Sequence, residues 1–223
     1  MFDFIIASTQ RTGSGFLCQL LNQTGVIANV GEYLNPRQIE LFSEQHELPQ
    51  RESVIALVKK RKEIGGAVGV KIHHPNFLHL SKLFDLSEVL PRKVILTERN
   101  DLIAQAVSLA RARQTKSFSS SMDPVAIPEY DFREISLAAH QLQNQTVAWN
   151  RILKRANVLP FRVGYEDLCE QPSNVIGSIL GHLGLHAARE VEPKKVPNRI
   201  QRDHQNKLWA NRFQKESSQN SNV

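Results

Sequence analysis

Four short apolar runs, each followed by a helical pattern, constrain this chain of 223 residues more than any other feature. Three of the runs cover residues 2–7, 67–72 and 93–98, and the fourth lies within VLPFRVGYEDL. β-branched and aromatic residues recur in them, which favours buried strands. Strands that alternate with helices usually pair in parallel through right-handed crossovers. The pattern therefore predicts an α/β fold with a mostly parallel central sheet flanked by helices.

The prediction assigns one domain to residues 1–214, a length that suffices for one hydrophobic core. Two segments fall outside the alternation of strands and helices. Residues 115–130, rich in serine and proline, are predicted to form a long loop of the kind that often serves function. Residues 215–223, KESSQNSNV, are predicted to be disordered because they lack a regular apolar pattern.

Composition indicates a soluble protein of the cytoplasm. No stretch approaches the roughly 18 consecutive apolar residues of a membrane span, and the start MFDFIIASTQ lacks the basic region of a signal peptide. Cys18 and Cys169 show no spacing typical of a disulfide framework or a metal site. The 28 basic residues exceed the 22 acidic ones by 6, which favours an anionic partner. Since no nucleic-acid-binding motif is present, a small phosphorylated ligand explains this excess as well as nucleic acid does.

The segment STQRTGSGFLCQLL, residues 8–21, places glycines and hydroxyls between the first predicted strand and the first predicted helix. Free N–H groups at a helix start bind anions, and Arg11 adds a bidentate donor. The glycine spacing matches neither the nucleotide-binding P-loop nor the dinucleotide fingerprint, which disfavours a kinase or a dehydrogenase. An ordinary tight turn between strand and helix is the alternative for this loop.

Six motifs follow one another in an order typical of a known family. They are STQRTGSGFLCQLLNQTGVIANVGEYLNP, GVKIHH, RNDLIAQAVSLARARQT, QTVAWN, FRVGYEDL and LWANRF. The chain thereby resembles the bacterial trehalose 2-sulfotransferases and their relatives over nearly its whole length. The resemblance implies a P-loop-like sulfotransferase fold and transfer of a sulfuryl group from 3′-phosphoadenosine-5′-phosphosulfate (PAPS) to a carbohydrate or glycolipid hydroxyl, with adenosine 3′,5′-bisphosphate (PAP) as the product. It implies that the reaction needs no metal and that nucleic acid is not a partner. It does not identify the acceptor, and it does not decide whether the protein forms a homodimer.

The resemblance also assigns residues to the cofactor. The loop that binds the 5′-phosphosulfate corresponds to Arg11, Thr12, Gly13, Ser14 and Gly15. The arginine and serine that bind the 3′-phosphate match Arg99 and Ser108. A tyrosine near the nucleotide matches Tyr165, which is alternatively a half-buried residue at a strand end. A further basic residue near the C-terminus remains to be chosen among Lys194, Lys195, Arg199 and Arg202.

Two loop residues depart from the family's pattern. Gln10 stands where proline is usual, which removes a rigid turn without removing an anion donor. Thr12 stands where serine is commoner, and it keeps the hydroxyl. We expect cofactor binding to survive both changes.

Sulfuryl transfer requires a base for the attacking hydroxyl and donors for the leaving oxygen. Arg11 is the predicted donor, and Glu32, in VGEYLNP, matches the family's general base; otherwise it caps the next segment or faces solvent. His73 and His74 follow a predicted strand, where α/β sites form, and either would position the acceptor or share the proton. A loop feature without function is the alternative for this pair. Lys71 would hold sulfate oxygens or be an exposed lysine.

Two further alternatives stay open at this stage. Arg111 and Arg113 either extend the 3′-phosphate site or form a solvated helix face. A non-catalytic protein that binds a nucleotide or polyanion on the same fold is the alternative function, and the presence of Arg11, Arg99 and Glu32 weighs against it.

Overall fold

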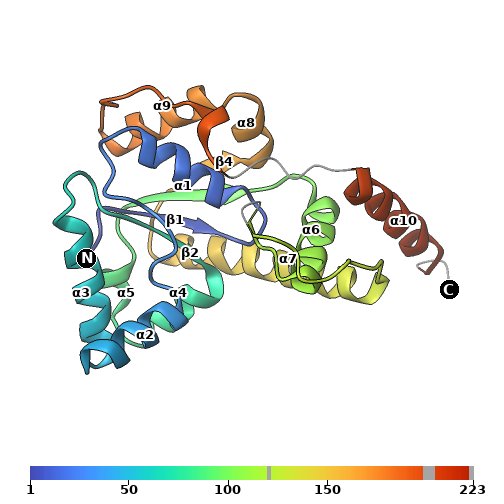
Figure 1. The fold of residues 1–223 in the computed structure, drawn as a ribbon, viewed down its shortest axis with the longest axis horizontal. Helices are drawn as coiled ribbons and strands as arrows, with labels where there is room; N and C mark the ends of the chain where they lie inside the picture. The colour runs from blue at the N-terminus through green and yellow to red at the C-terminus, as the bar shows by residue number, and fades with distance from the viewer. Residues whose placement is uncertain (120–121, 198–203, 221–223) are drawn as a thin grey trace.

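The computed structural model describes residues 1–119, 122–197 and 204–220. Within these residues, the centre of the molecule is a four-stranded sheet in the order β2-β1-β3-β4, with all strand pairs parallel. The strands are β1 (Phe4–Ser8), β2 (Gly69–His73), β3 (Lys93–Glu98) and β4 (Phe161–Gly164). Helices cover both faces of the sheet (Figure 1). The predicted α/β fold with a parallel central sheet is therefore confirmed.

Helices make up most of the remaining described chain. They are α1 (Ser14–Gln23), α2 (Pro36–His46), α3 (Gln50–Lys62), α4 (His74–Leu80), α5 (Leu86–Val89), α6 (Leu102–Thr115), α7 (Phe132–Arg155), α8 (Tyr165–Glu170), α9 (Pro172–Leu183) and α10 (His204–Asn220), with a 3-10 turn at Pro193–Lys195. Local caps explain several boundaries. The carboxylates of Asp101 and Asp131 accept the backbone N–H groups that begin α6 and α7, and Gly184, at φ 71°, ends α9.

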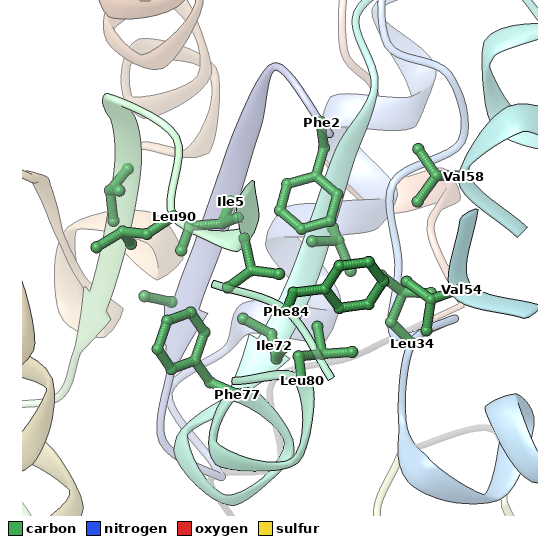
Figure 2. Packing of buried hydrophobic residues seen from close by; sticks show 14 of the residues in the cluster. Phe2, Ile5, Leu34, Val54, Val58, Ile72, Phe77, Leu80, Phe84 and Leu90 are labelled. Atoms are coloured by element: carbon green, nitrogen blue, oxygen red, sulfur yellow. The ribbon is translucent and has the colours of Figure 1, made fainter. Parts of the chain in front are cut away.

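Two buried clusters hold helices to the two faces of the sheet. Because side chains alternate along a strand, Ile5 and Phe4 of β1 point to opposite faces. Ile5 packs in a cluster with residues of β2 and of α2 to α5, which Figure 2 shows from close by. Phe4 packs with residues of α1 and α9 on the other face. In Figure 1, α1, α8 and α9 accordingly lie on one side of the sheet and α2 to α5 on the other.

Helix α7 is anchored beneath the end of β1. Trp149 is fully buried, and its Nε1 donates a hydrogen bond of 3.0 Å to the carbonyl of Ser8. Phe77 of α4 packs against the same indole, with ring centroids 4.8 Å apart. This anchor positions α4 and α7 beside the carboxyl end of the sheet, where sites form in parallel α/β proteins.

The C-terminal helix differs from the prediction of a disordered tail. Residues 215–220 form the last turns of α10, so disorder is wrong for them, and 221–223 lie outside the described residues. Trp209 and Phe213 bury the helix against α6 and α7. Glu216 then accepts hydrogen bonds from Arg212 Nε at 2.7 Å and from the Tyr130 hydroxyl at 3.0 Å. The apolar anchors precede residue 215, so the composition of the tail alone does not reveal them.

The long predicted loop connects α6 to α7. Thr115, the first residue of the predicted loop, is the last residue of α6, whereas its other described residues, 116–119 and 122–130, form neither helix nor strand, as predicted. In the described part of the chain, none of the helices has both the length and the apolar character that crossing a bilayer requires.

Candidate active site

The loop between β1 and α1 has a backbone conformation that costs free energy. Arg11 has φ 66° and Gly13 has φ 74°, both left-handed, and a non-glycine residue pays about 1–2 kcal/mol there. A Cβ on Gly13 would lie 2.9 Å from Cδ2 of Tyr165, so glycine allows that ring to pack against the loop. Strained backbone that a fold maintains is concentrated at functional sites.

Side-chain hydrogen bonds hold this loop in place. Thr12 Oγ1 donates to the carbonyl of Thr9 at 3.0 Å and shares a bond of 2.7 Å with Thr97 Oγ1 of β3. Gln105 Nε2, from α6, donates to the carbonyl of Gln10 at 2.6 Å and to Thr9 Oγ1 at 3.0 Å. Gln105 therefore restrains the carbonyl of Gln10, where a proline ring would otherwise stiffen the chain. Sequence reasoning missed Gln105 and Thr97, because neither belongs to a local motif of the loop.

Thr12 is only 1% exposed, and its hydroxyl already makes the two hydrogen bonds just described. Gly13 is the N-cap of α1, and Ser14 and Gly15 are its first residues. The first N–H groups of a helix have no acceptor within the helix, and the positive end of the helix dipole lies there. The start of α1 is therefore suited to an anion, with backbone N–H groups as donors.

Two arginines meet beside the start of α1. Arg11 Nε donates to Ser108 Oγ at 2.9 Å, and Arg11 Nη1 donates to the carbonyl of Phe118 at 2.5 Å. Arg99 Nη1 donates to the carbonyl of Arg11 at 3.4 Å, and its guanidinium lies 4.4 Å from the ring centroid of Tyr165. Burial lowers the pKa of Arg11, and the neighbouring charge of Arg99 lowers it further. We call Arg11, Arg99 and Ser108 the arginine cluster; its repelling charges favour an anionic ligand.

A second group of charged residues gathers at the end of β2. Lys71 Nζ lies 2.6 Å from Glu32 Oε2, and His73 Nε2 lies 3.7 Å from the same oxygen. Asn76 Nδ2 donates to Glu32 Oε1 at 3.2 Å. We call Glu32, Lys71 and His73 the glutamate cluster. The N-cap of α2 is Asn35, so Glu32 does not fill that role.

The ionisation of the glutamate cluster follows from its contacts. Burial raises the pKa of Glu32, but the charge of Lys71, then His73, and hydrogen bonds from Lys71 and Asn76 outweigh it, and the pKa lies below its ordinary value. Burial, aided by the charge of Lys71, lowers the pKa of His73 to about 4. At neutral pH the carboxylate is therefore ionised and the imidazole is neutral.

The two clusters flank the loop on neighbouring strands. Ser8, the last residue of β1, pairs in register with His73 of β2 and with Thr97 of β3. Ser8 Oγ also shares a hydrogen bond of 2.8 Å with His73 Nδ1. The glutamate cluster thus lies on the β2 side of the loop, and the arginine cluster follows β3. Sequence reasoning missed Ser8, although its place directly before the loop is a usable signal.

The other predicted residues have different surroundings, and Arg111 is the one of them whose charge also lowers the pKa of Arg11. His74 begins α4, and its ring meets Trp149 edge-on at 5.9 Å, so the two histidines occupy different environments. Arg111 Nη1 donates to Asn206 Oδ1 of α10 at 2.8 Å, and Arg113 bonds to Gln141 of α7. Lys194 and Lys195 are exposed, while Arg199 and Arg202 lie outside the described residues.

A cavity of about 420 Å³ opens beside Arg11. Arg11, Ser108 and Arg111 provide polar walls, and Met122 and Ile127 of the long loop provide apolar ones. Ile127 is 91% exposed. The volume falls within the range of small-molecule sites, and the walls combine cations with apolar surface.

Comparison with known proteins identifies relatives of this chain. The Stf0 sulphotransferase family profile matches residues 81–216, more than half of the chain. A trehalose 2-sulfotransferase from Mycolicibacterium smegmatis is 24% identical over 256 aligned residues, which cover 96% of this chain and 95% of the relative. A nodulation protein H from Rhizobium tropici is 30% identical over 199 residues, covering 83% of this chain and 77% of that protein.

Solved structures resemble the fold. A sulfotransferase domain from the curacin biosynthetic pathway superposes with a TM-score of 0.56 at 16% identity, covering 86% of this chain and 77% of that domain. A sulfotransferase from Alicyclobacillus acidocaldarius gives a TM-score of 0.53 at 12% identity, covering 96% and 91%. At these identities the likeness concerns the fold alone. With the family profile and the 30% identical relative, it leads to one conclusion: the chain belongs to the Stf0 sulphotransferase family.

Proposed function

We propose that this sulfotransferase moves a sulfuryl group from PAPS to a hydroxyl of a carbohydrate or glycolipid. One observation carries the proposal: Arg11 and Arg99, two like charges, converge with Ser108 beside the start of α1, while the ionised Glu32 lies on the β2 side of the same loop. A ligand with two separated phosphate groups suits the cationic arginine cluster. A neutral nucleophile suits the carboxylate of the glutamate cluster. The relative named a trehalose 2-sulfotransferase supports a sugar acceptor.

The residues of the arginine cluster fit the two ends of PAPS. Residues 11–15 and the start of α1 would hold the 5′-phosphosulfate, and Arg99 and Ser108 the 3′-phosphate, with Tyr165 beside the nucleotide. Two of the acceptors of Arg11 are a neutral hydroxyl and a carbonyl. Charge-assisted bonds to a phosphate oxygen are stronger than bonds to neutral acceptors, so Arg11 can exchange them for the ligand.

Glu32 is proposed as the general base. When bound, PAPS supplies the sulfuryl group and the bridging oxygen that leaves with PAP. Lys71 holds the Glu32 carboxylate at 2.6 Å and keeps its pKa low, which makes it a weak base. If the ammonium turns toward an anionic oxygen of the ligand, the pKa of Glu32 rises. Glu32 would then accept the proton of the acceptor hydroxyl more readily, while neutral His73 positions that hydroxyl.

The proposal includes the surroundings of the reaction. The sulfotransferase domain includes α10, because Trp209 and Phe213 pack against α6 and α7. Cys18 and Cys169 are not joined by a disulfide, which suits a reducing bacterial cytoplasm. No metal is assigned a role, and a homodimer is compatible with the family.

A thermal melt with PAP and with ATP tests the donor. At a PAP concentration of about 100 times Kd, linkage stabilises the fold by about 2.7 kcal/mol, which raises the melting temperature by roughly 5–10 °C for a chain of this size. ATP, which has no 3′-phosphate, should give a smaller rise. A larger shift with ATP than with PAP would contradict the proposal.

Transfer of [³⁵S]sulfate from labelled PAPS to a panel of sugars and extracted glycolipids then tests turnover. Labelled product supports the enzyme. PAP binding without labelled product from any acceptor would favour the non-catalytic binding protein instead.

A further inference from the structure

A groove of about 730 Å³ lies along α7, apart from the arginine cluster. Its polar lining residues come from three helices: His74 of α4, Arg113 of α6, and Glu134, Gln141, Asn144 and Gln145 of α7. Figure 1 shows α6 and α7 side by side, with α4 near α7. These amide and charged side chains include both donors and acceptors, which suits a molecule with many hydroxyl groups.

Gln145 has a buried acceptor atom that a ligand in this groove could satisfy. It is only 6% exposed, and its Oε1 is buried with no hydrogen-bond partner among the described residues. A buried acceptor without a donor costs about 1–3 kcal/mol. A hydroxyl group that enters the groove would supply the missing donor.

One wall residue of the groove, His74, is connected to the glutamate cluster through the chain and through Trp149 and Ser8. His74 lines it and directly follows His73, whose Nε2 lies 3.7 Å from Glu32 Oε2. Trp149, one helical turn beyond Gln145, contacts the ring of His74 and donates to the carbonyl of Ser8. A ligand that contacts His74 would therefore lie near the end of β2, which carries His73 of the glutamate cluster.

The charges of the groove favour a neutral ligand. Arg113 is already bonded to Gln141 Oε1, and the carboxylate of Glu134 lies in the same wall. An anion would meet that carboxylate, whereas a sugar hydroxyl can donate to it. The cavity beside Arg11 shows the opposite bias, with Arg11 and Arg111 in its walls.

We infer that this groove is the acceptor subsite, that it takes a neutral sugar of about two rings, and that Gln145 is a specificity-determining residue in it. The inference rests on the proposed function, because it assumes that a sugar approaches Glu32. The size agrees, since sites of 300–1,000 Å³ enclose ligands of this kind.

Saturation-transfer NMR with trehalose, maltose and cellobiose tests the inference, with and without PAP. We expect at least one disaccharide to bind the wild-type protein, and Gln145→Leu to weaken its affinity about 10-fold, as loss of a buried hydrogen bond does. Gln143→Leu, an exposed position on the same helix, is the matched control and should bind as the wild type does.

A melting curve separates binding from folding. Replacing an unsatisfied buried acceptor by an apolar group is neutral or stabilising, so Gln145→Leu should keep or raise the melting temperature while it loses the sugar. If Gln145→Leu melts at a lower temperature than the wild type, the sugar affinity of Asn144→Ala tests the inference instead. The side chain of Asn144 is exposed and lines the groove, so its removal should leave the fold intact. A loss of about 3-fold in affinity supports the inference, and unchanged affinity overturns it.

Two results overturn the inference outright. One is equal sugar affinity in Gln145→Leu and the wild type. The other is a wild-type protein that binds none of the three disaccharides, with PAP or without it. Failure of PAP to bind would instead contradict the proposed function, and the sugar titrations without PAP would still test the groove.

Discussion

The arginine cluster and the glutamate cluster lie on opposite sides of one loop, yet they compensate their charges differently. In the glutamate cluster, the carboxylate of Glu32 meets the ammonium of Lys71 at 2.6 Å. In the arginine cluster, Arg11 donates to a neutral hydroxyl and a carbonyl and lies near a second cation, Arg99. The carboxylate of the first cluster faces a cation, whereas the second cluster brings two cations together, which favours an anionic ligand there. The difference suits the proposed reaction, which pairs a polyanionic donor with a neutral hydroxyl.

Removing the carboxylate of Glu32 should change turnover more than any other substitution predicted here. Glu32→Gln keeps the shape of the side chain but cannot accept a proton, and loss of a general base lowers turnover by about 10²- to 10⁴-fold. PAP affinity should stay nearly constant, because the arginine cluster is untouched. Rates of [³⁵S]sulfate transfer and PAP titrations measure both quantities.

Glu44→Gln, an exposed change on α2, controls for the loss of one negative charge. Wild-type turnover in Glu32→Gln would remove the residue from the base role. Equal losses in both variants would indicate a general electrostatic effect instead.

Arg99→Ala tests the other side of the comparison. A hydrogen bond between charged groups contributes about 1.5–3 kcal/mol, so PAP affinity should fall by about 10- to 100-fold. Calorimetric titration with PAP measures this. Arg151→Ala, an exposed arginine of α7, should leave the affinity unchanged, and an equal loss in both variants would contradict a specific role for Arg99.

Acid should weaken the fold through the glutamate cluster. His73 has a pKa of about 4 in the folded protein and about 6.5 when unfolded. The unfolded chain therefore binds more protons between these values, and stability falls as the pH drops through that window. Between pH 7 and pH 5 the loss is about 2 kcal/mol. Glu32, whose pKa is also lowered, adds to the loss only below its ordinary value.

Urea unfolding at pH 7 and pH 5 measures this dependence. In His73→Gln, the difference in unfolding free energy between the two pH values should become smaller by most of that amount. An unchanged difference would show that His73 does not carry the acid sensitivity of the fold.

Local patterns explain how much of the fold was predictable. The strand Lys93–Glu98 has the predicted boundaries, and Asp101 and Gly184, residue types that commonly begin and end helices, do so at α6 and α9. The end of the chain was not predictable in the same way, because the last turns of α10 depend on Trp209, Phe213 and a bond from Tyr130, which is 86 residues away from Glu216. Composition over nine residues contains no information on such distant contacts.

The candidate site also has residues that local motifs predict and residues whose role depends on distant contacts. Arg11, Arg99 and Ser108 were selected from motifs, and the fold brings them within contact of one another. The assignment of His73 and His74 was left open, because a pattern of adjacent residues cannot say which side chain meets Glu32. Packing of His74 against Trp149 separates the two.

The sequence by itself determined the parallel α/β order, the glycine loop before α1 and the residue types at each strand end, since these depend on neighbours a few positions apart. Tertiary structure alone decided the ionisation of Glu32 and His73, the restraint of Gln10 by Gln105, and the groove around Gln145. Each of these joins residues from separate elements. Burial and charge at such contacts depend on three-dimensional distance, which the order of residues does not specify.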